Sequence, residues 1–406
     1  MKLYGNCWQI PSAGQYYRVS VPLRAMEKLG LARSFLDDPY QDQVKRQDQV
    51  FHSDIQIQFM VAGKPLHAQC QAIADMKQGK NVLGETQFPP VVVYDTDDDL
   101  KTLSPLNPKF ATLGTRDGDG NLLMPRSEMG IKFDDPNSSD EPLYLWKHNQ
   151  DTAAGRFAAE RNVVGHAHVR KMADTASAIT VTCPQLAERM KEFGKPVYVY
   201  PNSLLFDDNK NYDIRRGSDD IRVLWQGGYS HFPDFYPLRQ AFGEAHKSMP
   251  QIKWVVFGTL FRWVYEQINP LRVEFHKWVG HELFHMKYGT LAFDINIAPL
   301  VDNTFNSCKS GIKWYEAAAL KVPTLAQASG PYKDEIIDGE NGLLFSTPQE
   351  FVEKLECLVK DADYRKVLGQ RAYDWVHEYR DAEKNVVGLH KFYDGLLKTH
   401  RDRLAA

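Results

Sequence analysis

The second half of the chain repeats one pattern: a short apolar run that stops at glycine or proline and leads into a stretch with helical periodicity. The first such unit opens with Ile221–Trp225, turns at Gly227 and Gly228, and becomes helical over Pro237–His246. Three further apolar runs follow, at Ile252–Phe257, Phe293–Ala298 and Pro323–Ala326. Short buried strands that alternate with helices predict a parallel sheet covered on both faces. Strand, glycine turn and helix in this order also begin a Rossmann-like nucleotide-binding unit.

The first half shows the same α/β alternation less regularly. Helices are predicted over Tyr17–Leu29 and Ala153–Ala173. The candidate strands are Ile55–Met60, Val91–Tyr94, Ala178–Val181 and Val197–Tyr200. Between Leu100 and Asn149, an RDGDGN turn and repeated Asp, Pro and Ser residues interrupt the pattern. These residues predict a loop-rich insertion at about 100–150, of the kind that often contacts a partner.

The length of the chain indicates two domains, because 406 residues exceed what one hydrophobic core usually serves. Hydrophobic residues make up 43% of the sequence, enough to fill two cores. The polar stretch Phe206–Asp220 is the predicted linker. We therefore expect an N-terminal domain over 1–205, a linker over 206–220, a second domain over 221–375 and a helical tail over 376–406.

Charge, hydropathy and cysteine content argue against several other classes of protein. The formal net charge of −3 gives no overall attraction to nucleic-acid phosphates or anionic lipid. No stretch approaches the length of a membrane span and the N-terminus lacks the apolar core of a signal peptide, so a cytoplasmic protein is expected. The five cysteines are odd in number and lack metal-ligand spacing, so we expect neither a disulfide framework nor a zinc site.

The segment from Asn303 to Phe345 carries the most information. Lys309 and Ser310 precede a predicted helix that carries Lys313 and Glu316, and a strand with the sequence VPTLA follows. Beyond this strand the order is Gly330, Glu335, Asp338, Gly339 and Gly342, and then another apolar strand. This order resembles the donor-binding signature of retaining GT-B glycosyltransferases, in particular glycosyltransferase family 4, or group 1.

The chemistry of this segment is suited to a diphosphate. A helix N-terminus after residues 306–310 presents N–H groups and the positive end of its dipole. Lys309 and Lys313 add cationic charge, because residues four apart share one face of a helix. In the family that the chain resembles, the carboxylate at the position of Glu316 accepts hydrogen bonds from the ribose hydroxyls, and the resemblance implies this role here. The alternative is a surface ion pair between Lys313 and Glu316.

One position departs from the family pattern. Two glutamates usually occur with seven residues between them, and the first of them falls on Cys308 in this chain. Its contact with the sugar then passes to Asn306 or to the backbone amides around Ser307–Ser310. Tyr332, which follows the glycine of the same signature, is a further candidate for donor binding.

The sequence WQGGYSHFPDF at the start of the second domain also resembles these glycosyltransferases, in which a glycine turn faces the donor phosphates. Gly227 and Gly228 are predicted to allow close approach of an anion to the backbone and the positive φ angles of a tight turn. His231 is the histidine that this motif supports. An ordinary strand-to-helix turn is the alternative.

In the first domain, SAGQYYR resembles the glycine-containing first loop of GT-B enzymes, which reaches toward the reacting sugar or the acceptor. The acceptor-side candidates in this loop are Gly14, Gln15, Tyr16 and Arg18. The alternative is an ordinary start of a helix with a solvated Arg18.

A cluster of carboxylates follows the strand Val91–Tyr94 and comprises Asp95, Asp97, Asp98 and Asp99. An Asp-x-Asp after a strand is how GT-A glycosyltransferases hold a divalent cation. We favour a second interpretation, in which Asp97 is catalytic and Asp95 contacts the acceptor, because the donor signature lies in the other domain and lysines can replace a metal. A solvated acidic loop is the third interpretation, for Asp98 and Asp99.

The resemblance implies the GT-B fold: two Rossmann-like domains that face each other across a cleft, and a C-terminal helix that crosses back to the first domain. It implies an enzyme that transfers a hexose from a nucleoside diphosphate sugar, such as a UDP or GDP sugar, to an acceptor hydroxyl with retention. Lys309 and Lys313 would stabilise the leaving diphosphate. No cofactor is expected besides this co-substrate, and a divalent cation is allowed but not expected. The expected acceptor is a saccharide or a lipid-linked saccharide.

Two other functions stay open. The pattern with its insertion also resembles virus-encoded transferases that act on a hydroxylated base in DNA, which would make nucleic acid a partner and binding salt-dependent. Cys308 in place of a glutamate favours a catalytically silent protein that binds a nucleotide sugar. Slow hydrolysis of the donor without an acceptor would argue against the silent protein.

Overall fold

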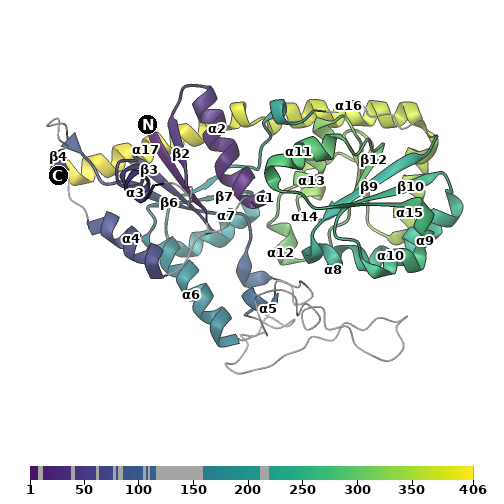
Figure 1. The fold of residues 1–406 in the computed structure, drawn as a ribbon, viewed down its shortest axis with the longest axis horizontal. Helices are drawn as coiled ribbons and strands as arrows, with labels where there is room; N and C mark the ends of the chain where they lie inside the picture. The colour runs from purple at the N-terminus through teal and green to yellow at the C-terminus, as the bar shows by residue number, and fades with distance from the viewer. Residues whose placement is uncertain are drawn as a thin grey trace. The chain divides into compact units, whose positions relative to one another are not determined.

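The computed structural model describes residues 1–7, 12–37, 42–60, 64–75, 79–80, 86–103, 107, 110–115, 159–210 and 219–405. The chain divides into two compact units (Figure 1). Unit 1 comprises Met1–Asp99, Val164–Leu205 and Tyr379–Ala406, and unit 2 comprises Leu100–Val163 and Phe206–Glu378. Most of the predicted insertion, residues 116–150, and the middle of the predicted linker, residues 211–218, lie outside the described residues.

Unit 1 is built on a six-stranded parallel sheet with the strand order β2-β1-β3-β6-β7-β8. These strands are β1 (Lys2–Cys7), β2 (Arg33–Leu36), β3 (Ile55–Phe59), β6 (Val91–Thr96), β7 (Ala178–Val181) and β8 (Val197–Val199). The four predicted strands are confirmed as β3, β6, β7 and β8. The prediction missed β1, which contains Gly5 and Asn6, and β2, a four-residue edge strand with no fully buried residue.

Helices and short turns connect the strands of unit 1. They are α1 (Ala13–Gln15), η1 (Tyr16–Ser20), α2 (Val21–Lys28), α3 (Gln43–Phe51), α4 (Lys64–Asp75), α6 (Ala159–Thr175), α7 (Pro184–Met190), η3 (Lys191–Phe193) and α17 (Ala382–Ala405), with the small hairpin β4 (Gly79–Lys80) and β5 (Thr86–Gln87). The predicted helix Tyr17–Leu29 has a π-helical turn at its start, and Pro22 follows in the first turn of α2. Proline has no N–H to donate, so it fits a helix start better than a helix interior.

The last helix, α17, belongs to unit 1 and contacts α2 and β6. Its buried face consists of Ala382, Val386, Leu389, Tyr393 and Leu397. Lys28 Nζ donates to Glu383 at 2.7 Å, and His400 Nε2 lies 3.0 Å from the carbonyl oxygen of Pro89. The C-terminal helix therefore returns to the N-terminal sheet, as the resemblance implied.

Unit 2 has a second six-stranded parallel sheet with the order β11-β10-β9-β12-β13-β14. Its strands are β9 (Ile221–Gly227), β10 (Ile252–Gly258), β11 (Val273–Lys277), β12 (Ile295–Ala298), β13 (Thr324–Gln327) and β14 (Leu343–Phe345). Every apolar run predicted in this half is confirmed as a strand. The missed strand, β11, lies at the sheet edge and carries charged residues between apolar ones, so it has no continuous apolar run.

The helices and turns of unit 2 are η2 (Leu100–Thr102), α5 (Phe110–Leu113), η4 (Phe206–Asp208), η5 (Tyr229–His231), α8 (Phe232–Phe235), η6 (Tyr236–Leu238), α9 (Arg239–Ser248), α10 (Arg262–Gln267), η7 (Pro270–Arg272), α11 (His281–Gly289), α12 (Thr304–Ser307), α13 (Ile312–Ala319), α14 (Gly330–Glu335), α15 (Pro348–Lys360) and α16 (Ala362–Tyr379). Among the described helices, none combines the length and the apolar character needed to cross a membrane. Phe206, in the predicted linker, packs edge-on against Tyr373 of α16.

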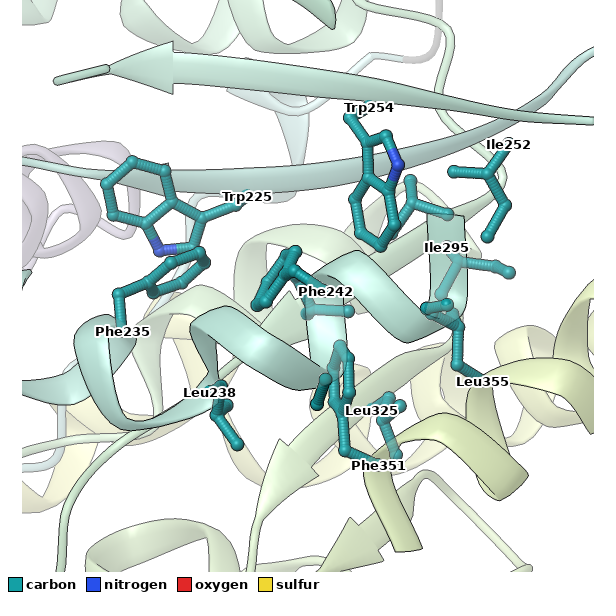
Figure 2. Close-up of a cluster of buried hydrophobic side chains, with 14 of the residues drawn as sticks. Trp225, Phe235, Leu238, Phe242, Ile252, Trp254, Ile295, Leu325, Phe351 and Leu355 are labelled. Carbon is teal, nitrogen blue, oxygen red and sulfur yellow. The ribbon is translucent and has the colours of Figure 1, made fainter. Parts of the chain in front are cut away.

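The two faces of the unit 2 sheet bury separate hydrophobic cores. Figure 2 shows Trp225 of β9 and Trp254 of β10 with Phe235, Phe242 and Phe351 from the helices over one face. The ring of Phe242 lies 4.9 Å from that of Trp254 and 5.2 Å from that of Phe351. The other face packs side chains of β9 and β10 against α11 and α13: Leu224, Val255, Phe257, Phe284, Tyr288 and Ala317. This confirms a parallel sheet covered on both faces and fixes α13 against it.

Candidate functional site

The candidate donor site lies in unit 2, where β9 ends and a short turn leads into α8. In parallel α/β sheets, ligands bind outside the carboxyl ends of the strands. Gln226 and Gly227 are the last residues of β9, and His231 and Asp234 follow in the turn and in α8. Packing brings this segment against α12 and α13.

Asp234 connects three segments of the site. Its Oδ2 lies 2.8 Å from His231 Nδ1, and its Oδ1 accepts from Asn306 Nδ2 and from the backbone N–H of Val301, both at 3.0 Å. Asn306 also donates to the carbonyl of Val301 at 2.8 Å. The side chain of Asp234 is buried. One carboxylate thus ties the turn after β9 to the loop after β12 and to α12.

Lys313 and His231 are in contact. The Nζ of Lys313, on α13, lies 3.0 Å from Nε2 and 3.3 Å from Nδ1 of the imidazole. Two residues that the sequence assigned to the donor site are therefore brought together from positions 82 residues apart.

Burial and neighbouring charges shift the pKa values of these groups. Burial, and then the charge of Lys313, lower the pKa of His231 to about 4. Burial also lowers the pKa of Lys313 to about 8, and Lys309 acts in the same direction, whereas Asp234 and Glu316 oppose the shift. Burial alone would raise the pKa of Asp234, but the hydrogen bond and charge of His231 and the two lysines hold it below its usual value. The site therefore contains a neutral imidazole, from His231, next to the ammonium group of Lys313. A bound anion would stabilise the charged form of this ammonium group.

Glu316 lies on the face of α13 that packs on the sheet. It is buried and accepts a hydrogen bond from Nε2 of Gln226 at 2.5 Å. The alternative of a surface pair between Lys313 and Glu316 is therefore wrong, because this carboxylate is turned toward the end of β9. Gln226 holds one carboxylate oxygen at a fixed place beside the glycine turn.

The glycine turn differs from the prediction in its backbone. Neither Gly227 nor Gly228 has a positive φ, and Gly228 has a φ of −84°. The positive φ belongs to Gly258, at +120°, where a Cβ would lie 2.4 Å from the carbonyl oxygen of Gly227. A Cβ at Gly228 would meet no atom within 4 Å. Gly258 therefore allows β9 and β10 to end side by side, and Gly228 leaves open space next to His231.

The remaining donor candidates surround α13. This helix begins after Gly311, so Lys309 and Ser310 precede it and do not form a helical face with Lys313 as predicted. The Nζ of Lys309 lies 4.5 Å from the centre of the Phe305 ring. Tyr332 is buried on α14, and burial raises its pKa. Cys308, which replaces the first glutamate of the family pattern, is also buried.

In unit 1, the acceptor-side candidates divide into two groups. A Cβ at Gly14 would lie 2.9 Å from Oδ2 of Asp97 and 2.7 Å from Phe59, so the first loop and the carboxylate cluster meet closely at this glycine. Gln15 is buried, and its N–H is capped by Ser12 Oγ at 3.2 Å, while the ring of Tyr16 packs edge-on against Tyr17. Their role toward an acceptor stays a prediction.

Arg18 and Asp95 form a buried ion pair. Arg18 Nε and a terminal nitrogen donate to the two oxygens of Asp95 at 2.9 and 2.8 Å, and the other terminal nitrogen donates to Asn202 at 3.1 Å and to the carbonyl of Tyr200. The hydroxyl of Thr180 also donates to Asp95. The alternative of a solvated Arg18 is therefore wrong. The pair links the first loop to β6 and to the segment after β8.

Asp99 is also buried and pairs with Arg189 Nε at 2.9 Å, so a solvated loop is wrong at this position. Within the described parts of the chain, no group of three or more His, Cys, Asp or Glu side chains is arranged to hold a metal ion. The sequence reasoning missed Gln226, Asp234 and Gly258. The motif around His231 includes Asp234, but only the fold shows what this carboxylate contacts.

Comparisons with known proteins agree with this architecture. Residues 240–375 match the family model described as glycosyl transferases group 1, which covers Lys309, Lys313 and Glu316 but not His231. Over 88 residues the chain is 32% identical to an uncharacterized glycosyltransferase of Methanocaldococcus jannaschii. That alignment spans 21% of this chain and a quarter (25%) of the relative.

Two solved structures are similar over nearly the whole chain. Sucrose-phosphate synthase from Thermosynechococcus elongatus has 13% sequence identity and a TM-score of 0.60, with 98% of this chain and 99% of that chain covered. HepE from Anabaena has 12% identity and a TM-score of 0.57, with 97% and 99% covered. At such identities the similarity establishes the fold alone. The chain therefore has the GT-B fold, and its residues 240–375 match the family model of the glycosyl transferases group 1.

Proposed function

We propose that the chain is a glycosyltransferase that moves a hexose from a nucleoside diphosphate sugar to an acceptor hydroxyl, with retention at the anomeric carbon. The contact between Lys313 and His231 at the carboxyl end of β9 is the observation that carries the proposal. An ammonium group that is buried beside a neutral imidazole and a second lysine is stabilised by a bound dianion. Lys313 and Lys309 would hold the leaving diphosphate.

The nucleoside part of the donor is assigned to Glu316. Its carboxylate is buried beside the glycine turn and held by Gln226, where it can accept hydrogen bonds from two ribose hydroxyls. HepE from Anabaena was solved in complex with UDP and glucose, so UDP-glucose is the first donor to test. We propose a saccharide or a lipid-linked saccharide as the acceptor.

The proposal needs no divalent cation, because two lysines and the first N–H groups of α13 supply positive charge at one place. Asp97, next to Gly14, is proposed to contact the reacting sugar or the acceptor. Retention follows if the acceptor hydroxyl attacks from the face that the leaving phosphate occupies, so no carboxylate nucleophile is assigned.

A thermal-shift screen against UDP-, GDP-, ADP- and dTDP-sugars, each with and without EDTA, tests the donor. A ligand that binds the native state raises the unfolding temperature. We expect one nucleotide series to stabilise the protein, with the same shift in EDTA. Stabilisation that disappears in EDTA would contradict binding by lysines alone, and no stabilisation by any nucleotide sugar would contradict the function.

A catalytically silent nucleotide-sugar-binding protein is the second candidate, favoured by the buried Cys308 at the position of a family glutamate. Release of free sugar from the stabilising donor, followed by NMR without acceptor, separates the two. Slow hydrolysis that Lys313→Gln abolishes supports the transferase, and its anomeric product reports the stereochemistry. Binding without any hydrolysis or transfer supports the silent protein.

A further inference from the structure

Asp234 is a buried anion at the centre of the donor site, outside the segment that matches the family model. A deprotonated carboxylate only accepts hydrogen bonds, so Nδ1 of His231 must donate to it at 2.8 Å. In the neutral ring, Nε2 is then unprotonated. Lys313 Nζ lies 3.0 Å from Nε2 and 3.3 Å from Nδ1, which places the ammonium group over the face of the ring. The carboxylate thus sets the tautomer and the orientation of the ring that the ammonium group contacts.

The charges around Lys313 come from three segments. Asp234 on α8 and Glu316 on α13 favour the charged ammonium, while Lys309 in the loop before α13 disfavours it. His231, in the turn after β9, is the titratable group in direct contact. Burial acts against the charged form, and Asp234 is the larger of the two opposing anionic influences.

Asp234 also holds the backbone segment that leads to Lys309 and Lys313. Val301 N–H and Asn306 Nδ2 both donate to its Oδ1, and Asn306 lies on α12, directly before Lys309 and α13. Asn303 caps the same short helix through the N–H of Asn306 at 2.8 Å. The Asp234 carboxylate therefore affects the charge of Lys313, its contact with His231, and the position of the backbone that carries Lys309 and Lys313.

We propose that Asp234 is a positioning residue of the donor site, which acts through His231, Asn306 and Val301 to keep the Lys313 ammonium charged and in place for the donor diphosphate. The inference rests on the proposed function, because it assigns the diphosphate to Lys313. It goes further because it assigns to Asp234, a residue that does not touch the ligand, the task of keeping that lysine charged.

Calorimetric titration of UDP into the full chain at pH 6 and pH 8 tests this role with Asp234→Asn. Asn keeps the shape but removes the charge. Without the anion the pKa of Lys313 falls further, so less of the ammonium form is present at pH 8 than at pH 6. We expect the Kd for UDP to rise about tenfold at pH 8 and less than about twofold at pH 6, relative to the unchanged protein.

Two further variants separate the possible results. Asp294→Asn is the matched control, because Asp294 accepts a backbone N–H, from Arg222, at the opposite ends of β9 and β12. It should leave UDP binding unchanged at both pH values. Lys313→Gln should weaken UDP binding at both. The proposed function fails if the unchanged protein binds no UDP. It also fails if Lys313→Gln binds UDP with the same Kd as the unchanged protein.

An equal loss at pH 6 and pH 8 in Asp234→Asn overturns the inference that Asp234 keeps Lys313 charged, and no loss at either pH overturns the positioning role altogether; both outcomes leave the proposed function intact. If this variant does not fold, the unchanged protein still gives an answer through the nitrogen-15 shifts of His231, assigned with His231→Gln. At pH 7 the neutral ring should carry its proton on Nδ1. A proton on Nε2 would overturn the inference.

Discussion

At the scale of residues, the candidate donor site combines a residue from a local motif with a partner that is distant in the sequence. Glu316 stands on a helix that the sequence predicted, but its partner Gln226 lies 90 residues earlier, at the end of β9. The resemblance to the donor-binding signature over Asn303–Phe345 identified the carboxylate. Only packing of α13 on the sheet shows that this carboxylate is buried and held by an amide. A buried, oriented acceptor can select a ligand that brings its own donors.

Substitution of Glu316 by Gln tests ribose recognition. The amide is close in size but loses the charge that strengthens hydrogen bonds from hydroxyls, so UDP affinity should fall about tenfold to hundredfold. Inorganic pyrophosphate has no ribose, so its affinity should stay within about twofold. Competition binding measures both, with the exposed Glu340→Gln as control. An equal loss for both ligands would mean that Glu316 supports the site without contacting the ribose.

At the scale of elements, the ends of β9 and β10 determine the form of the turn. Thr259 N–H donates to the carbonyl of Gly227 at 3.0 Å, which joins the two strands where they end. The chain passes through this point with Gly258 in a backbone conformation that other residues rarely adopt. Two glycines near this turn therefore have different tasks, one in folding and one beside the ligand site.

Alanine substitution distinguishes these tasks. Gly258→Ala would place a Cβ against the carbonyl of Gly227 at a φ of +120°, so we expect a loss of about 2 to 4 kcal/mol in the free energy of unfolding. Gly228→Ala has open space and a negative φ, so its unfolding should match the unchanged protein while UDP binds more weakly. Chemical denaturation and titration measure both. Normal stability of Gly258→Ala would contradict the strained turn.

At the scale of the whole molecule, the final helix makes the N-terminal unit depend on the C-terminus of the chain. Tyr393 of α17 is 2% exposed, and Leu389 is buried beside it on the same helix face. The N–H of Leu204 also donates to the carbonyl of Arg380, just before α17, at 2.7 Å. The carbonyl of Leu204 accepts from the N–H of Ala382, the first residue of α17, at 2.9 Å. The core of unit 1 therefore includes side chains from α17.

Tyr393→Ala should destabilise unit 1 by about 3 to 5 kcal/mol, the usual cost of truncating a buried aromatic side chain. Hydrogen exchange suits this test, because it reads each unit separately. Exchange should accelerate in β6 and β3, and stay unchanged in β9 and β10. Tyr379→Ala, at a tyrosine that is 53% exposed, is the control. Faster exchange confined to unit 2 would contradict the assignment of α17.

Buried histidines give the stability of the ligand-free protein a pH dependence. Burial lowers the pKa of both His231 and His281 to about 4. Between that value and about 6.5, the unfolded chain binds more protons than the folded chain, so stability rises with pH and is lost as the pH falls. The unfolding temperature should therefore be higher at pH 7 than at pH 5.5. His281→Phe, which keeps the ring stack on Phe284, should reduce this difference, and a flat profile in the unchanged protein would contradict it.

The sequence by itself determined the class of fold and the segment that carries the candidate donor site. Strands buried on both faces need continuous apolar runs. The strands β9, β10, β12 and β13 could therefore be predicted from such runs and from the glycine and proline residues that end them. Edge strand β11 carries charges and gave no such signal. Lys313 and Glu316 were identifiable because the donor-binding signature that they resemble is a continuous run of sequence.

The tertiary structure alone decided which groups meet. Gln226 with Glu316, His231 with Lys313 and Asp234 with Asn306 are separated by 90, 82 and 72 residues. Arg18 and Asp95, predicted to face an acceptor, instead pair with each other in the interior of unit 1. Local patterns record helix and strand preferences, whereas these contacts depend on strand order and on how helices pack across the sheet. The same packing sets the burial and the neighbouring charges, and therefore the pKa values of His231 and Lys313.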